Sequence, residues 1–289
     1  MILKGTFGSL FLCLLNSNMK KLPVRRLLDN FKDPFPGRWN GGDPFRSAVM
    51  NAFSMGFPIA EQYFIYTLKQ SLRTLSEKQR ESFESEIKGF IGQEAMHSII
   101  HKNFNQNLLN LGYKNLYEKD LKQEVSRIVH RDLKTHLAAT AAIEHIAAMC
   151  SMWLLNNQWV LDGAEDKFKT MWLWHCAEET EHRNVGFDVF KMTGGTEKIR
   201  ILTYLLISII MFKNLTMQTI HNLHHDKSLF KLSTWKTGYK IMLSKNGLVR
   251  FVFKHWLKYF SSKFHPSQLD GLVSEKWLEN NNNNYMVIA

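Results

Sequence analysis

Apolar residues recur every three or four positions through most of this chain, which is the spacing of an amphipathic helix. Four long helical segments are predicted between residues 44 and 195, and shorter ones follow them. No run alternates apolar and polar residues as a half-buried strand would, and no Gly-x-Gly-x-x-Gly loop occurs. The pattern therefore predicts an all-α fold with a helical bundle at its centre.

Capping signals give the ends of the first two helices. The Asp43-Pro44 pair predicts an N-cap followed by a favoured first helical residue. That helix is expected to reach about Leu75, with a kink or a restart at Pro58. The run Ser76–Gln79 has the form of a capping box, and the second helix is expected to continue from it to Leu111.

The other two helices are predicted from longer periodic runs. The third is expected over residues 119–158 and becomes rich in Ala around Glu144. Asp162 is expected to cap the fourth helix, which would end at Gly194-Gly195. At about 1.5 Å per residue, each of the last three helices would be roughly 40 Å long or longer.

Composition divides the chain into four regions. They are an irregular lead-in at 1–45, a helical bundle at 46–195, a basic helical cap at 196–275 and a disordered tail at 276–289. The tail prediction depends on the low-complexity Asn280–Asn284 run. The largely apolar run Ile201–Phe212 is too short to span a membrane and is expected to be a buried or interfacial helix.

The N-terminal residues and the cysteines indicate the cellular compartment in which the protein is located. Residues 7–15 resemble a short signal sequence, but no clear cleavage site follows, and Met19 is favoured as the true start. The three cysteines, Cys13, Cys150 and Cys176, are scattered and form no Cys-x-x-Cys. A cytoplasmic location is therefore expected, with attachment to the inner membrane surface as an alternative.

The net charge of +11 is confined to one part of the chain. Residues 198–265 carry 12 Lys and Arg against one acid, Asp226, whereas the remaining 25 basic and 25 acidic residues cancel. Three interpretations are ordered by preference: a helical cap with a basic outer face, a peripheral contact with an anionic membrane, and nucleic acid. Nucleic acid comes last because no recognition motif is present.

Acidic and imidazole residues recur in the four predicted helices at spacings that place them on shared faces. The candidate metal ligands are Glu61, Glu94, His97, Glu144, His175, Glu179 and His182. A Glu and a His three positions apart can reach the same region, and a carboxylate in apolar surroundings is costly unless it is paired or metal-bound. Two metal ions are expected, with iron favoured and manganese or zinc as alternatives.

Further side chains are candidates for contacts outside the ligand set. His101, four residues after His97, is expected to be a hydrogen-bond partner or a substrate contact rather than a ligand. Glu178 is a candidate to orient a ligating His, with a solvent-facing position as the alternative. Asp188 is a candidate to accept a proton from a ligand His on a neighbouring helix.

Several of these runs carry a family resemblance. Phe57–Phe64, Phe90–His97 and Trp174–His182, with the later Phe264-His265-Pro266, resemble the bacterial family described as predicted metal-dependent hydrolases. The likeness covers about residues 20–275, and Ala60 departs from it because the family pattern has Gly there. The resemblance implies hydrolysis by a metal-bridged water.

A more distant likeness concerns the order of the ligands. It is similar to that of the di-iron arylamine N-oxygenases, and this implies a ferritin-like four-helix bundle with a di-metal centre and additional C-terminal helices. In that interpretation Glu94 and Glu179 bridge the metals or nearly do so, and His175 is an added imidazole. The favoured function is then a di-iron oxidase or oxygenase that uses dioxygen on a small organic substrate. A metal-dependent hydrolase and a non-catalytic metal-binding protein are the alternatives, and a homo-oligomer is left open.

Overall fold

Helices make up most of residues 22–289, the part of the chain that the computed structural model describes. The helices are α2 (Pro44–Thr74), α3 (Glu77–Asn110), α4 (Leu116–Ile128), α5 (Leu133–Asn156), α6 (Asp166–Glu181), α7 (Val185–Met192), α8 (Glu197–His225), α9 (Leu232–Met242), α10 (Leu248–Trp256) and α11 (Leu272–Asn280). Two short strands, β1 (Arg25–Leu27) and β2 (Tyr285–Val287), pair antiparallel. The all-α prediction is confirmed, and the ferritin-like assignment stays a prediction. The proposed start at Met19 lies outside the described residues.

The first two helices begin where their capping signals predict. The Asp43 side chain accepts a hydrogen bond from the backbone of Arg46, and Ser76 and Gln79 cap each other reciprocally. α2 continues through Pro58, so it does not restart there. Proline leaves the carbonyl four residues earlier without its helical partner. The Asn105 side chain of α3 donates to that carbonyl, of Ser54, at 2.8 Å, and so replaces the missing bond.

The third predicted helix is two helices in the structure. α4 ends at Ile128, and α5 starts after Asp132, whose side chain accepts a hydrogen bond from the Thr135 backbone at 2.8 Å. The apolar spacing is similar on both sides of the break, so it did not reveal the break. The side-chain cap at Asp132 stabilises a new helix start at this position, and it favours the break over a continuous helix.

The fourth predicted helix is also interrupted, and it begins later than expected. α6 starts after Glu165 rather than at Asp162, and it ends at His182. α7 follows three residues later, with Gly186 packed closely on Thr140 of α5. At about 1.5 Å per residue, the 16 residues of α6 span only about 24 Å, well short of the predicted length.

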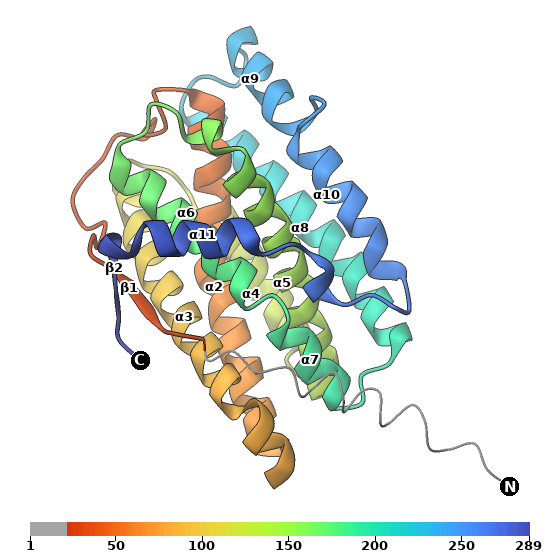
Figure 1. Cartoon of the computed structure of the whole chain (residues 1–289). Coiled ribbons are helices and arrows are strands. Elements are labelled where there is room, and N and C mark those ends of the chain that lie inside the picture. The colour runs from red at the N-terminus through yellow and green to blue at the C-terminus, as the bar shows by residue number, and fades with distance from the viewer. Residues whose placement is uncertain (1–21) are drawn as a thin grey trace, which may run out of the picture.

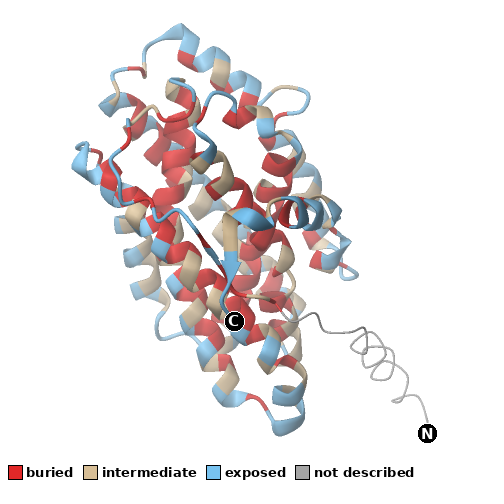
Figure 2. Ribbon diagram, turned by 60° about the vertical axis from the view of Figure 1, so that its left-hand side comes forward, coloured by how far each residue is buried: buried red, intermediate tan, exposed pale blue. Residues whose placement is uncertain are grey.

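The long helices pack side by side around a shared core (Figure 1). α2 packs on α3 and α8, and α5 packs on α6, α7 and α8, while α11 crosses over α6. Buried residues line the helix faces that point toward the centre of the bundle (Figure 2). α8 thus lies along the bundle rather than across its end.

The C-terminal segment does not form a disordered tail. Arg25 of β1 pairs with Val287 of β2, and the Tyr285 hydroxyl donates to the Leu278 carbonyl at 2.8 Å. Within the asparagine run, the Asn281 side chain donates to the Trp277 carbonyl at 2.8 Å. The prediction from low complexity was wrong because these partners lie on the folded body, outside the run itself.

Two helices in the described part of the chain are long and apolar enough to cross a membrane by composition. In α5, 78% of the most apolar 18-residue window is buried inside the protein, as in an ordinary core helix. In α8 the corresponding share is 17%. The run Ile201–Phe212 is part of a longer helix, Glu197–His225, than the sequence pattern indicated, and only a small share of that helix is buried.

Candidate metal centre

All the predicted ligands lie inside the bundle, and none exposes more than 3% of its surface. They come from α2 (Glu61), α3 (Glu94 and His97), α5 (Glu144), α6 (His175 and Glu179) and the residue that ends α6 (His182). Helical spacing places each Glu/His pair on one face, and packing of the four helices turns these faces toward one another. The structure brings the seven residues together in one connected group.

The first of two clusters in this group joins α3 to the end of α6. Glu94, His97, Glu179 and His182 each offer one ligand atom, and these atoms all lie within 4.8 Å of one another. Nε2 of His182 is 3.1 Å from Oε1 of Glu94, and Nδ1 of His97 is 3.5 Å from Oε1 of Glu179. We call these residues cluster A.

The second cluster lies next to the first. Glu61, His101 and His175 also offer ligand atoms within 4.8 Å of one another, and we call them cluster B. Nε2 of His175 is 3.3 Å from Oε1 of Glu179, so the Glu179 carboxylate touches both clusters. The sequence had placed His101 outside the ligand set, whereas the structure places it among the candidate ligands.

Many polar atoms of these residues have no hydrogen-bond partner among residues 22–289. They are both carboxylate oxygens of Glu61, Oε2 of Glu94, Oε1 of Glu144 and Oε2 of Glu179. Nδ1 of His97 and Nε2 of His182 face carboxylates of the same cluster, those of Glu179 and Glu94. Buried carboxylate oxygens without donors are unfavourable unless a cation satisfies them. Carboxylate and imidazole donors suit iron, manganese or zinc, so the residues fit a metal site.

Two ligand candidates are held in orientation by a second carboxylate. Nε2 of His97 lies 2.9 Å from Oε2 of Glu178, and Nδ1 of His182 lies 2.8 Å from Oε2 of Glu144. Each imidazole therefore uses one nitrogen for the supporting carboxylate and directs the other toward the carboxylates of cluster A. Such contacts fix the tautomer and the ring orientation of metal-binding histidines. Glu178 has the orienting position that the sequence suggested, and Glu144 acts in the same way.

Cluster B has its own supporting contacts. The Ser54 hydroxyl lies 2.8 Å from Nδ1 of His101, and Nε2 of His101 lies 3.1 Å from Nδ1 of His175. The Phe57 ring stacks on the His175 imidazole, with ring centres 4.6 Å apart. These contacts restrict both rings to one orientation.

Burial dominates the protonation of the carboxylates. It raises the pKa of Glu61 and Glu94 well above the usual value, and that of Glu144 to about 7. Burial acts in the same sense on Glu179, but the imidazoles of His175 and His97 outweigh it and hold the pKa of Glu179 well below its usual range. Glu179 thus favours its anionic form in the metal-free centre.

The pKa values of His97 and His175 shift in opposite directions. Burial by itself lowers the pKa of His97, but hydrogen bonding to Glu178 and Glu179 outweighs it and raises this pKa to about 10. Burial and the positive charge of His97 lower the pKa of His175 to about 4. His175 is therefore neutral at pH 7 and has a lone pair available for a metal.

Asp188 does not support a ligand histidine. Its Oδ1 lies 2.8 Å from Nε2 of His265 on the C-terminal segment, and both side chains are partly exposed. The prediction for Asp188 was wrong because α7 is separated from α6 by a break, which changes the direction of its faces.

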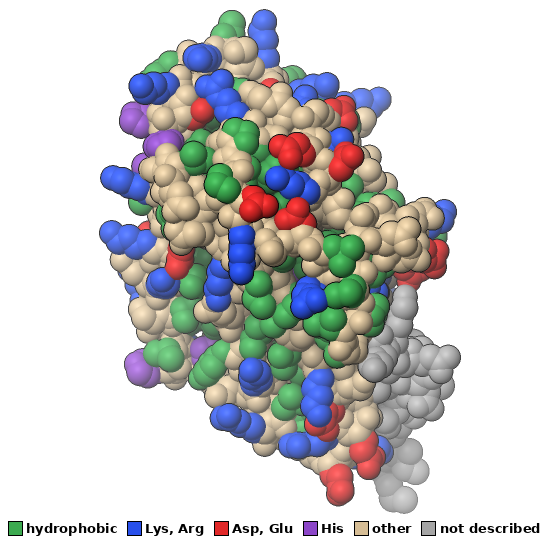
Figure 3. Space-filling view, turned by 90° about the vertical axis from the view of Figure 1, so that its left-hand side faces the viewer, with side chains coloured by type: hydrophobic (Ala, Val, Ile, Leu, Met, Phe, Trp, Pro, Cys, Tyr) green, Lys and Arg blue, Asp and Glu red, His purple; other side chains and the backbone are tan. Residues whose placement is uncertain are grey.

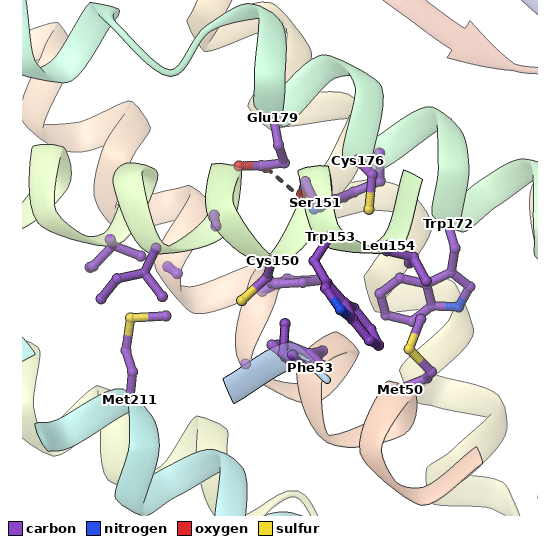
Figure 4. Close-up of a pocket in the computed structure, with 18 of the residues that line it drawn as sticks. Met50, Phe53, Cys150, Ser151, Trp153, Leu154, Trp172, Cys176, Glu179 and Met211 are labelled. Atoms are coloured by element: carbon purple, nitrogen blue, oxygen red, sulfur yellow. Dashed lines mark ion pairs between the residues drawn. The ribbon is translucent and has the colours of Figure 1, made fainter. Parts of the chain in front are cut away.

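An apolar cavity adjoins the two clusters. Its lining includes His175, Glu179, Phe57, Trp172, Ala147 and Met211. Figure 4 shows Glu179 of α6 and Met211 of α8 on opposite sides of this space, with Cys150 between them. The cavity reaches the centre at His175 and Glu179.

Some residues of the site were missed in the sequence. Arg25 donates to Glu178 at 2.9 Å and to Glu181 at 2.7 Å, although it belongs to the lead-in that was expected to be irregular. Nothing in the sequence around Arg25 indicates that this residue belongs to the site. Ser54 had a signal, because it lies seven residues before Glu61 on the same face of α2.

Comparison with known proteins gives one match. A family model described as "predicted metal-dependent hydrolase" matches residues 23–270, which includes both clusters and their supporting contacts. No curated protein and no solved structure matches the chain.

Proposed function

Because the chain belongs to the family of predicted metal-dependent hydrolases, we propose that it binds two metal ions and hydrolyses a substrate with an apolar part. The observation that carries the proposal is the set of buried carboxylate oxygens in clusters A and B that have no hydrogen-bond partner among residues 22–289, together with the imidazoles beside them. These atoms are buried beside an apolar cavity. This function was the alternative in the sequence analysis, and the family description favours it over the oxidase.

Each cluster would hold one ion. Cluster A offers two carboxylates and two imidazoles, and cluster B offers one carboxylate and two imidazoles. Glu179 lies between the clusters and is placed to serve both ions. When bound, two such ions lower the pKa of a coordinated water and polarise the bond that is cleaved.

The residues of the chain contribute orientation and exclusion of water. Glu178 and Glu144 hold the imidazoles of His97 and His182, which keeps the other nitrogens directed at cluster A. Phe57 and Trp172 cover His175 on the cavity side. An apolar group of the substrate would occupy the cavity, with its polar bond at Glu179.

Metal reconstitution tests this proposal. The protein is stripped with a chelator, reloaded without oxygen with zinc, manganese or ferrous ion, and assayed on ester and amide substrates of increasing acyl length. We expect close to two ions per chain and hydrolysis that the chelator abolishes. Glu179→Gln should remove the activity, whereas Glu84→Gln, a substitution at the surface of α3, should not. Absence of bound metal, or a loaded protein without hydrolysis, would contradict the proposal.

A second candidate function is oxidation by a di-iron centre. The two clusters consist of carboxylates and imidazoles, the donor types that iron accepts in carboxylate-bridged sites. The discriminating measurement is oxygen consumption by the anaerobically ferrous-loaded protein. Uptake of oxygen in proportion to bound iron, together with no hydrolysis under any metal, would favour this function over the hydrolase.

A further inference from the structure

The helix α8 has its polar side inward and its apolar side outward. Its buried positions include Arg200, Asn214, Gln218 and Asn222. Its exposed positions include Leu202, Leu206, Ile209, Phe212 and Ile220, with two thirds of the Ile209 and Phe212 surfaces accessible (66% and 67%). An amphipathic helix on the surface of a soluble domain has the opposite arrangement.

The inward polar side chains have specific partners. Oε1 of Gln218 accepts from the backbone of Leu116 and Tyr117 at 2.8 and 2.9 Å. Asn222 donates to the Ala48 carbonyl at 3.0 Å, and Arg200 donates to the Ser261 carbonyl at 3.0 Å. The orientation of α8 is therefore fixed by hydrogen bonds to the bundle, and the apolar side is held outward.

The helix α10 presents two parallel stripes to the outside. Val249 and Phe253 of α10, and Leu257 at the start of the 3-10 turn that follows it, are exposed apolar residues four positions apart. Arg250, Lys254 and Lys258 follow each of them by one position and are also exposed. Residues one position apart on a helix differ by about 100°, so an apolar stripe and a basic stripe run side by side.

The two helices are neighbours. Nε1 of Trp256, at the end of α10, donates to the Ser208 hydroxyl of α8 at 2.8 Å, and the two elements run side by side in Figure 1. Phe230 and Leu232 lie where α9 begins, between α8 and α10 in the sequence, and they are also exposed (92% and 72%). We define the α8–α10 face as the exposed apolar and basic residues of α8 and α10 named above.

The positive charge of this region limits which kind of partner can bind the α8–α10 face. Residues 198–265 carry 12 Lys and Arg, and their one acid, Asp226, is already paired with Arg38. The opposite side of the molecule, seen in Figure 3, intersperses acidic and basic side chains. A second copy would bring two basic faces together, which like-charge repulsion opposes. An apolar face with a basic stripe instead matches an anionic lipid surface.

We propose that the α8–α10 face docks on an anionic membrane surface. α8 does not cross the membrane in this arrangement, because its inner side stays packed on α2 and α5. Lys213 lies in the middle of α8 and pairs with Asp120 of α4 at 3.1 Å, which also favours a position at the interface. The apolar side chains enter the boundary between headgroups and acyl chains, and the basic residues contact the headgroups.

The position of the cavities gives this face a role for the metal centre. A second apolar cavity lies between α8 and α10 and is lined by Phe212, Phe253 and Trp256. It shares Cys150, Met211 and Leu248 with the cavity beside Glu179. The two apolar spaces therefore adjoin each other between the α8–α10 face and the clusters. This consequence rests on the proposed hydrolase, and it identifies the substrate as an amphiphile with an acyl chain.

Flotation with vesicles tests the docking. The full chain is mixed with phosphatidylcholine vesicles that contain 30% phosphatidylglycerol, or with phosphatidylcholine alone, at 50 mM and 500 mM salt. We expect binding to the anionic vesicles at low salt and at least tenfold weaker binding to the neutral ones and at high salt. No binding to anionic vesicles at low salt would overturn the proposal.

Matched variants locate the surface. Replacing Arg250, Lys254 and Lys258 together by Gln should weaken binding about 100-fold. The same change in charge on α3, at Lys78, Lys88 and Lys102, should weaken it less than threefold. The double variant F212S/F253S should also lose binding, with its circular dichroism melting curve unchanged. Equal effects of the two charge variants would overturn the proposal.

Two further outcomes separate the alternatives. If light scattering shows a dimer that F212S/F253S dissociates and vesicles do not compete with it, the occupant of the face is a second copy and the proposal is overturned. Flotation needs neither metal nor turnover. Binding without hydrolysis would therefore contradict the proposed function alone, and hydrolysis without binding would contradict the docking alone.

Discussion

Nε2 of His97 lies 2.9 Å from Oε2 of Glu178, and both side chains are completely buried. The other oxygen of Glu178 accepts from Arg25 at 2.9 Å, so a chain of contacts runs from the lead-in to the imidazole. This relationship holds Nδ1 of His97, which lies 3.5 Å from Oε1 of Glu179, toward cluster A.

The variant Glu178→Gln tests this support. We expect metal affinity, measured by competition with a chelating dye, to fall about 10- to 100-fold, because the carboxylate that orients His97 is lost. The control is Glu181→Gln, since Glu181 also bonds Arg25 but does not contact His97. Equal affinities of the two variants would show that Glu178 does not act through His97.

The number of bound metal ions should differ between a variant of Glu179, which contacts both clusters, and variants of residues that belong to cluster B alone. Glu179→Gln should reduce the metal content from about two ions per chain to less than one, because Glu179 contacts both clusters. Glu61→Gln and His101→Ala should each leave about one ion, because both residues belong to cluster B. Elemental analysis of dialysed protein measures this. Loss of both ions in Glu61→Gln would contradict two separable positions.

Metal uptake should release protons and become stronger as the pH rises. With a pKa of about 10, His97 is protonated in the metal-free protein at pH 7, and burial keeps protons on Glu61 and Glu94 as well. Ligands must lose their protons to bind, so affinity rises about tenfold per pH unit for each proton displaced. Titration calorimetry at pH 7 in buffers of different ionisation enthalpy should show more than one proton released. Affinity that does not change between pH 6 and pH 8 would contradict this protonation pattern.

A close backbone approach on α3 should make Gly89→Ala destabilising. A Cβ at Gly89 would lie 2.5 Å from the backbone oxygen of Leu22, so the segment that leads to Arg25 would have to shift. We expect a loss of about 1–2 kcal/mol, since overpacking outweighs the gain in helix propensity. Ser85→Ala, an exposed site on the same helix, is the control. Chemical denaturation measures both variants, and an unchanged or raised stability for Gly89→Ala would show that the contact can relax.

The breaks within the bundle show where local sequence was sufficient and where it was not. Asp43 and Ser76 cap their helices as predicted, because a cap depends on residues within three positions. Asp132 offered the same kind of signal, but the continuous apolar spacing on both sides concealed it. The break after His182 depends on contacts with other elements, among them the bond from Arg183 to the Leu269 carbonyl.

The sequence by itself determined the all-α class and the pairing of each Glu with its His, since both follow from spacing along a helix. Only the tertiary structure decided which side chains support the ligands, because Arg25 and Glu178 are 153 positions apart in the chain. It also decided the direction of α8. Periodicity shows that a helix has an apolar side. The hydrogen bonds that Gln218 accepts from the Tyr117 backbone and that Asn222 donates to the Ala48 carbonyl turn that side outward.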